Sequence, residues 1–468
     1  MILFALLAMA SPTRANEGPV VQLPSFVVRD NRVLPGPQRW DYASVTGIEA
    51  LSDADPAQAK ALLTDFVEFH RAIAAVWPLE REEAAVPAML ILCGEKARAR
   101  PFVPADAPAG VDSYLSMSIQ DREMASIVID LDPAVLATGS SDDTAEILRR
   151  EFIHLVISRL GRLPPWIRQG LWTAFSTMRC SDQAFEFPAI DGGAELKSRQ
   201  AGDLSALATA EKSGSFLPLS ALFAASFSGG DETTSPWSRE CYQFVHYCLV
   251  GEPQRYRVPF LEYVQATQTA SVDEALFRKY FHRGYSEFTA ELWKYTGFAA
   301  PVGFRLTTPG GKASPLPPIH FQRATDAQSG RITGETLRMQ GKSEAAHWAL
   351  IAPYLRGVHD PELLASLGLQ EVAAGNDGRA RSFLAAATTG GTVRARAWAE
   401  LGRLRLRAFE SQAGPTGALT SAQVHEVVGL LIKASRLPPP LAEELQYYRE
   451  TMAHAPRARN ALPPAPSK

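Results

Sequence analysis

The sequence lacks the features that mark several common classes of protein. No internal run reaches the roughly 18 apolar residues that a membrane-spanning helix needs, so we expect no stable membrane span. The 47 Lys and Arg residues nearly balance the 50 Asp and Glu residues, and this charge predicts no nucleic-acid partner. There is no G-x-S-x-G, no P-loop and no G-x-G-x-x-G after a predicted strand. These absences exclude the best-known hydrolase and nucleotide-binding signatures.

Cysteine is also scarce, with four residues in 468. None of them forms a C-x-x-C pair, which argues against a redox or zinc motif. Cys241 and Cys248 lie seven apart on one predicted helix, about 10 Å along its axis, which is too far for a disulfide between them. We interpret all four cysteines as small core residues.

The composition that remains is that of an ordinary globular protein, with 46% apolar and 21% charged residues and length enough for two or three domains. An apolar run over 2–10 is followed by Thr13-Arg14-Ala15, which could serve as a cleavage site, and we predict a signal peptide over 1–15. Because no basic residue precedes the run, an ordinary N-terminal strand is the alternative. A signal peptide would make the mature protein secreted or periplasmic.

The next region alternates short apolar strands with one long helix. Pro56 begins an amphipathic helix that ends near Val76. Strands are predicted at 20–30, in two pieces within 39–53, and at 89–93, 113–119 and 125–131. Further along we predict a strand or lid at 184–190, a loop at 191–215, and helices at 217–227, 238–250, 259–268, 271–281 and 285–296. The pattern predicts an α+β fold with a small mixed sheet followed by helices.

Residues 142–178 are the most informative stretch of the chain. A first helix is predicted over 143–160 and a second from about Trp166, with Gly161 and two prolines between them. Apolar residues surround the first helix almost completely, which predicts that it is buried. Three polar residues nevertheless interrupt its middle: Arg150, Glu151 and His154.

Two blocks in this stretch resemble the active-site helices of the gluzincin zinc peptidases, within the peptidase MA group. The first helix of that family carries H-E-x-x-H, and the second opens with a pattern close to P-x-W-L-x-E-G-L. This chain has R-E-F-I-H at 150–154 and P-W-I-R-Q-G-L at 165–171. The resemblance implies a gluzincin-like domain over 16–298.

The metal ligands that the resemblance implies are largely replaced. Arg150 stands at the first His position, His154 at the second, and Gln169 at the Glu position. A guanidinium has no lone pair to give and a neutral amide is a poor zinc ligand, whereas catalytic zinc needs three protein ligands. Glu151 keeps the position of the general base but would have no zinc-bound water to activate. We therefore expect no metal, no cofactor and no peptidase activity, with Glu151 vestigial.

The predicted helix at 238–250 places Tyr242 and His246 four residues apart on one face. Active gluzincins use a Tyr or His beyond the second motif to stabilise the oxyanion, so the resemblance makes these two residues candidates for a cleft. Packing and hydrogen bonding in the core is the alternative interpretation.

The C-terminal part differs in composition from what precedes it. Residues 299–328 are rich in Pro and Gly and predict a linker. Residues 329–454 read as helix–turn–helix units with Gly and Asn-Asp-Gly turns, and they resemble tetratricopeptide repeats. Such repeats would offer a concave surface to an unknown protein or peptide, while a plain α-helical domain is the alternative. Residues 455–468 are predicted to be disordered.

Three functions are compatible with these observations. The first is a catalytically inactive metallopeptidase-like protein that binds or scaffolds other molecules outside the cytoplasm. The second is an active zinc peptidase in which residues such as Glu186, Glu195 or His246 substitute for the lost ligands. The third is an unrelated α-helical repeat interaction protein with a chance E-x-x-H, which predicts that residues 20–135 form no sheet beside the central helices.

Overall fold

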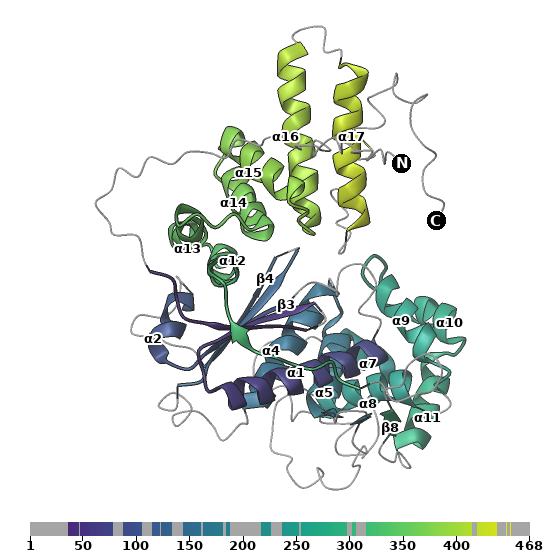
Figure 1. The fold of residues 1–468 in the computed structure, drawn as a ribbon. Coiled ribbons are helices and arrows are strands. Elements are labelled where there is room, and N and C mark those ends of the chain that lie inside the picture. Colours follow the sequence, from purple (N-terminus) through teal and green to yellow (C-terminus); the bar gives the residue numbers. More distant parts are fainter. Residues whose placement is uncertain are drawn as a thin grey trace, which may run out of the picture. The chain divides into compact units, whose positions relative to one another are not determined.

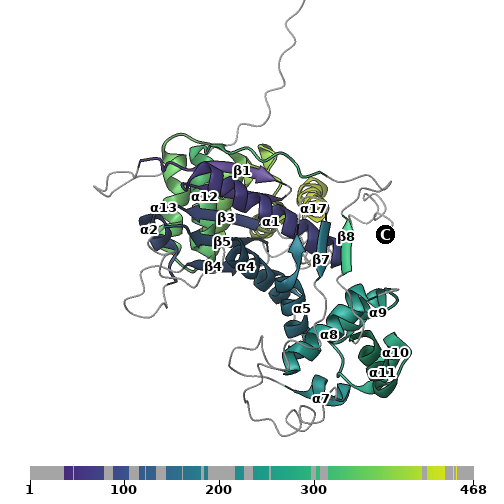
Figure 2. The ribbon, with the colours of Figure 1, turned by 90° about the horizontal axis from the view of Figure 1, so that it is seen from below.

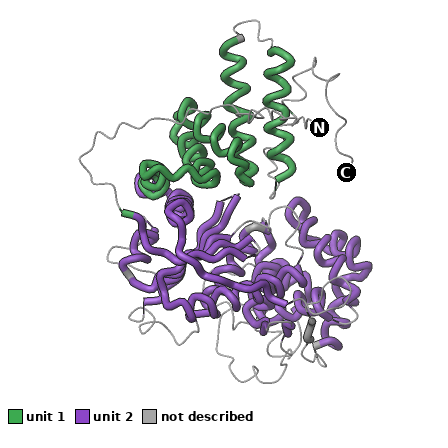
Figure 3. The backbone as a smooth tube through the Cα atoms, in the orientation of Figure 1, with its two compact units in different colours: residues 1–36, 347–468 green, residues 37–346 purple. Residues whose placement is uncertain are grey.

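The structure is a computed structural model of the 468-residue chain. It describes residues 36–45, 47–77, 88–104, 115–121, 123–132, 144–160, 162–180, 184–187, 217–225, 236–251, 254–296, 302–305, 315–413, 419–437, 446 and 450. The described part of the chain divides into two compact units (Figure 3). Residues 37–346 contain the first unit, and the described residues from 347 onward contain the second.

A six-stranded mixed sheet forms the centre of the first unit (Figure 1), in the order β4-β5-β3-β2-β1-β9. Its strands are β1 (Asp41–Val45), β2 (Ile48–Ser52), β3 (Ala88–Cys93), β4 (Ser116–Gln120), β5 (Ala125–Asp130) and β9 (Gln322–Arg323). β2, β3 and β5 run parallel, whereas β1, β4 and β9 pair antiparallel with their neighbours. Every residue of β3 and β5 is buried, as expected for strands covered on both faces.

Helices cover the two faces of this sheet. α1 (Pro56–Val76) and α4 (Thr144–Arg159) lie on one face, and α12 (Asp326–Met339) lies on the other (Figure 1). On the α12 face, Ser126 and Thr336 share a hydrogen bond of 2.7 Å between their hydroxyl oxygens, and both residues are fully buried. The chain therefore returns to the sheet after the region predicted as a linker.

Ion pairs join α12 to the sheet at two further points. Arg331 Nη2 lies 2.5 Å from Glu49 Oε1 on β2, and Arg338 Nη2 lies 2.6 Å from Asp121 Oδ2 just after β4. Each arginine holds the pKa of its carboxyl below the usual range, despite burial that acts in the opposite direction. The first unit thus includes a helix that the sequence analysis assigned to the C-terminal repeats.

The long helix α1 begins and ends as its sequence predicts. Asp55 caps it, since Oδ2 accepts 3.0 Å hydrogen bonds from the amides of Ala57 and Gln58, and Pro56 takes the first helical position. At the other end, Arg257 of α9 donates to the carbonyl of Val76 at 2.9 Å. A cation at a helix C-terminus satisfies carbonyls that lack intrahelical partners.

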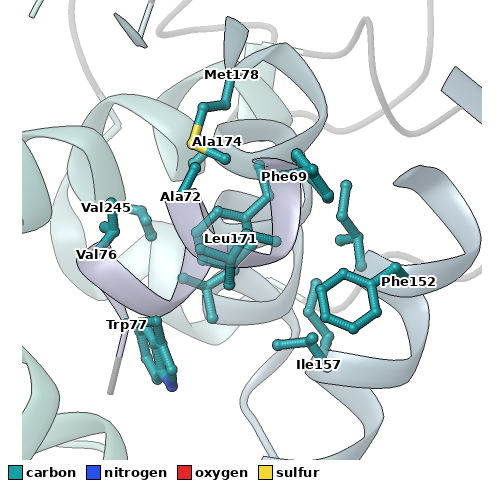
Figure 4. Packing of buried hydrophobic residues seen from close by; sticks show 14 of the residues in the cluster. Phe69, Ala72, Val76, Trp77, Phe152, Ile157, Leu171, Ala174, Met178 and Val245 are labelled. Carbon is teal, nitrogen blue, oxygen red and sulfur yellow. The ribbon is translucent and has the colours of Figure 1, made fainter. Parts of the chain in front are cut away.

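A set of helices follows α4 in the first unit (Figure 2). They are α5 (Pro165–Thr177), α7 (Leu219–Ala224), α8 (Pro236–Val250), α9 (Arg257–Ala266), α10 (Glu274–Phe281) and α11 (Tyr285–Thr296). Figure 4 shows the core where α1, α4, α5 and α8 meet, with Phe69 and Val76 from α1, Phe152 from α4, Leu171 from α5 and Val245 from α8. The predicted pair of central helices is therefore embedded in one continuous apolar core.

Several short elements complete the first unit. A second sheet has the order β6-β7-β8, from strands Arg179–Cys180, Ala184–Phe187 and Val302–Arg305. A short helix α2 (Lys96–Ala99) and a 3-10 turn (Arg100–Phe102) follow β3. β8 and β9 both fall in the Pro- and Gly-rich range 299–328, where the sequence analysis predicted no strand.

The second unit is helical. Its helices are α13 (Ser343–Leu355, which begins in the first unit), α14 (Pro361–Ala373), α15 (Asp377–Thr389), α16 (Ala395–Ala413) and α17 (Ser421–Arg436). α14 and α15 approach closely at Gly368, where an added Cβ would lie 2.6 Å from the Leu384 side chain. The helices α12, α14 and α16 start 35 and 34 residues apart along the chain.

The α+β fold class is confirmed. No helix in the described part of the chain is long and apolar enough to cross a membrane. The predicted signal peptide at 1–15, the strand at 20–30, the loop at 191–215 and the tail at 455–468 lie outside the described residues.

Candidate functional site

The outer face of α4 is a polar stripe of four exposed residues spaced four apart: Glu146, Arg150, His154 and Ser158. Residues at this spacing lie on one side of a helix, one above the other. The apolar residues of α4 are buried as predicted, whereas Glu146, Arg150, His154 and Ser158 form an exposed side of the helix. The apolar residues do crowd the helix, but the polar ones recur with the helical period and so share a single face.

Arg150, at the position of the first metal ligand, takes part in this stripe. Its Nη2 lies 3.3 Å from Glu146 Oε1, in an i, i+4 ion pair. The two side chains are 46% and 56% exposed, so water screens the pair. A cation paired with a carboxylate one turn away offers no electron pair to a metal ion.

Glu151, at the position of the general base, is tied to the neighbouring strand. Ser116 Oγ on β4 donates a 2.6 Å hydrogen bond to Glu151 Oε1. Four residues further along β4, the Gln120 amide donates to Ser158 Oγ on α4. These two bonds hold the edge strand alongside the helix (Figure 2).

β4 is the outermost strand on its side of the sheet. Two main-chain hydrogen bonds flank the pairing of β4 with its neighbour β5. The Asp130 amide donates to the Leu115 carbonyl, and the Asp121 amide donates to the Met124 carbonyl. Because antiparallel pairs alternate, the main-chain groups of Ser116, Ser118 and Gln120 point away from β5. Among the described residues, no strand pairs with this edge.

Gln169, at the position of the third ligand, is buried between two helices. Only 5% of it is exposed, and its Nε2 donates a 2.6 Å hydrogen bond to Ser238 Oγ on α8. At the next residue, Gly170, α5 and α8 approach each other closely, because an added Cβ there would lie 2.5 Å from the Cys241 carbonyl oxygen. Gln169 therefore belongs to a tightly packed interface.

Tyr242 and His246 both lie on α8 with their side chains buried, 8% and 1% exposed. Burial raises the pKa of Tyr242 to about 12 and lowers the pKa of His246 to about 4. Both groups are thus neutral near pH 7. His246 Nδ1 lies 2.7 Å from the hydroxyl of Tyr295 on α11.

These residues make their contacts in three places. Glu151 bonds to β4 beside the α4 stripe, Gln169 and Tyr242 lie at the α5–α8 interface, and His246 contacts α11 and β7. Within the described residues, no three His, Cys, Asp or Glu side chains are grouped so that they could hold a metal ion. Arg150 and Gln169 do not fit a zinc ion, and of the proposed substitutes Glu195 lies outside the described residues.

Three serines of this region were not singled out by the sequence analysis: Ser116, Ser158 and Ser238. One signal was available, because Ser238, Tyr242 and His246 recur every fourth residue along α8 and so share a face. Ser116 carried no such signal, since its partner Glu151 is 35 residues away. No family model matches this chain, and a search of curated proteins finds no match either.

Proposed function

We propose that this chain is a catalytically inactive metallopeptidase-like protein that binds other molecules, outside the cytoplasm. The main observation behind this proposal is that the residues at both replaced ligand positions contact other protein side chains. Arg150 closes an ion pair with Glu146, and Gln169 links α5 to α8 through Ser238. Side chains engaged in these contacts leave a catalytic metal without two of its ligands.

The architecture around α4 supports the resemblance to gluzincins. A sheet lies beside α4, as the gluzincin hypothesis requires, and the hypothesis of an unrelated repeat protein predicts none there. The edge of β4 and the stripe on α4 give an extended peptide both main-chain partners and side-chain contacts. We propose this surface as the binding site.

The second unit supports a second binding surface. Its helices α14 and α16 start 34 residues apart, the length of a tetratricopeptide repeat, and Gly368 lets α14 and α15 pack closely. We propose that these helix pairs bind an unidentified protein or peptide, as stacked helical repeats do.

Metal analysis of the purified full chain tests the loss of catalysis. With zinc in excess, the wild type should stay empty and leave a mixture of peptides uncleaved. The double variant Arg150→His, Gln169→Glu should take up about one zinc, and adding His154→Gln should abolish the uptake. About one zinc per wild-type chain together with peptide cleavage would overturn the proposal. Zinc uptake by neither chain would contradict the kinship with gluzincins.

Peptide arrays test the binding surface on β4. Ser118→Pro removes an amide that points away from the sheet, so it should weaken binding of extended peptides at least tenfold. Ser118→Ala is the matched control, because it keeps that amide and should bind like the wild type. Equal binding by both variants would exclude the β4 edge.

A further inference from the structure

His246 lies where three elements of the first unit meet. It belongs to α8, its Nδ1 lies 2.7 Å from the Tyr295 hydroxyl on α11, and the ring of Phe187 on β7 meets it edge to face at 5.9 Å. Its side chain is 1% exposed. One imidazole ring therefore contacts both the strand and the helix that pack against α8.

The surroundings of His246 suit only a neutral ring. Nδ1 has the Tyr295 hydroxyl, whereas Nε2 has no hydrogen-bond partner among the residues that the structure describes. The titratable groups that face the ring are the phenols of Tyr242 on α8 and Tyr295 on α11, and β7 presents the apolar Phe187. In the described part of the chain, no charged group contributes to the lowered pKa, which comes from burial.

Protonation would make this arrangement unfavourable. An imidazolium has two N–H donors and a charge, whereas the described residues around the ring offer one hydrogen-bonded phenol oxygen, that of Tyr295, and no carboxylate. A buried cation without a counter-ion must reach water, and it can do so only if β7 or α11 moves away from α8. We propose that neutral His246 holds β7 and α11 against α8, and that its protonation at acidic pH releases them.

The pH dependence of the opening equilibrium follows from the difference between the pKa of His246 in the closed form and its pKa when exposed. A histidine that is neutral in the folded state and takes up a proton when exposed stabilises the closed form fully above pH 6.5, and this contribution is lost as the pH falls toward 4. Over that window the opening equilibrium should rise about tenfold per pH unit.

Hydrogen exchange of the full chain tests the proposal, read as protection factors at several pH values between 7 and 4. Wild-type amides of Ala184–Phe187 and Tyr285–Thr296 should lose protection about tenfold per pH unit, while those of α14 and α15 serve as an internal reference. The double variant His246→Phe, Tyr295→Phe removes both polar partners together, and its protection should be independent of pH in this window.

A second histidine provides the matched control. His70 on α1 also has a lowered pKa because it is buried, and its ring lies 5.4 Å from that of Phe152. His70→Gln should leave the pH response of β7 and α11 as in the wild type. Tyr295→Phe alone should keep the response, because His246 still titrates. A double variant that keeps the wild-type response, or a wild type without one, would overturn the proposal.

Discussion

The two helices that resemble the gluzincin active-site pair use the residues at the aligned ligand positions in different ways. On α4, Arg150 lies on an exposed stripe with an exposed partner. On α5, Gln169 is buried and its neighbour Gly170 touches the backbone of α8. Around Gln169, the residues that carry the second block of the resemblance, Trp166, Ile167 and Leu171, are all fully buried. The resemblance in α5 therefore rests on residues that pack in the core, and packing of this kind requires no metal ion.

The largest effect should come from filling the contact between α5 and α8. In Gly170→Ala the new Cβ would meet the Cys241 carbonyl and the Val245 side chain, and a main-chain carbonyl cannot rotate away. We expect a loss of about 3 kcal/mol in the free energy of unfolding of the first unit. Urea denaturation of the full chain would measure it.

Gly429→Ala on α17 is the matched control, because nothing lies within 4 Å of its added Cβ. A helical Gly→Ala change in open space should stabilise by about 1 kcal/mol. If Gly170→Ala also stabilised the protein, the close approach of α5 and α8 would be refuted.

A smaller effect should follow when the polar link at this interface is cut. Gln169→Leu removes the amide that bonds to the fully buried Ser238 hydroxyl, and we expect a loss of about 2 kcal/mol. Ser238→Ala should cost a similar amount. The double variant should cost clearly less than the two single changes added together, because both single changes remove the same hydrogen bond. Strict additivity in this cycle would show that the two side chains do not interact.

The sequence predicted most of the first unit's elements, because their patterns are local. Pro56 and the spacing of the apolar residues predicted where α1 begins and ends. The run of apolar residues at 89–93 corresponds to β3 (Ala88–Cys93). β8 and β9 escaped prediction, since a strand of two to four residues among prolines has no period to detect. Their pairing depends on partners more than 100 residues away.

The sequence predicted which residues belong to the candidate site, but it did not predict which residues they contact. The spacing of Arg150, His154 and Gln169 led to the hypothesis of a zinc site without its ligands, which concerns the chemistry of these side chains. It could not show that Gln169 would turn to Ser238 on a helix 69 residues further along. Long-range hydrogen bonds leave no trace in local periodicity, and so the two different uses of the ligand positions emerged only from the fold.

The smallest loss of stability should come from a substitution in the exposed stripe of α4. Two neighbouring arginines on this helix, one in the stripe and one outside it, can be compared. Arg149 forms two bonds to Asp65 on α1, one of them 2.8 Å from Nε to Oδ2, and it lies over the Phe69 ring at 5.5 Å. Arg150 has an exposed partner on its own helix. Arg150→Ala should therefore cost at most about 0.5 kcal/mol, whereas Arg149→Ala should cost about 2 kcal/mol.

Urea denaturation at low and high salt would separate the two arginines further. Salt screens an exposed pair more than a partly buried one, so the small cost of Arg150→Ala should vanish at 1 M salt while most of the cost of Arg149→Ala remains. A larger cost for Arg150→Ala than for Arg149→Ala would mean that Arg150 holds the fold together. The α4 stripe would then be a structural element, and its role as a surface for peptides would lose its support.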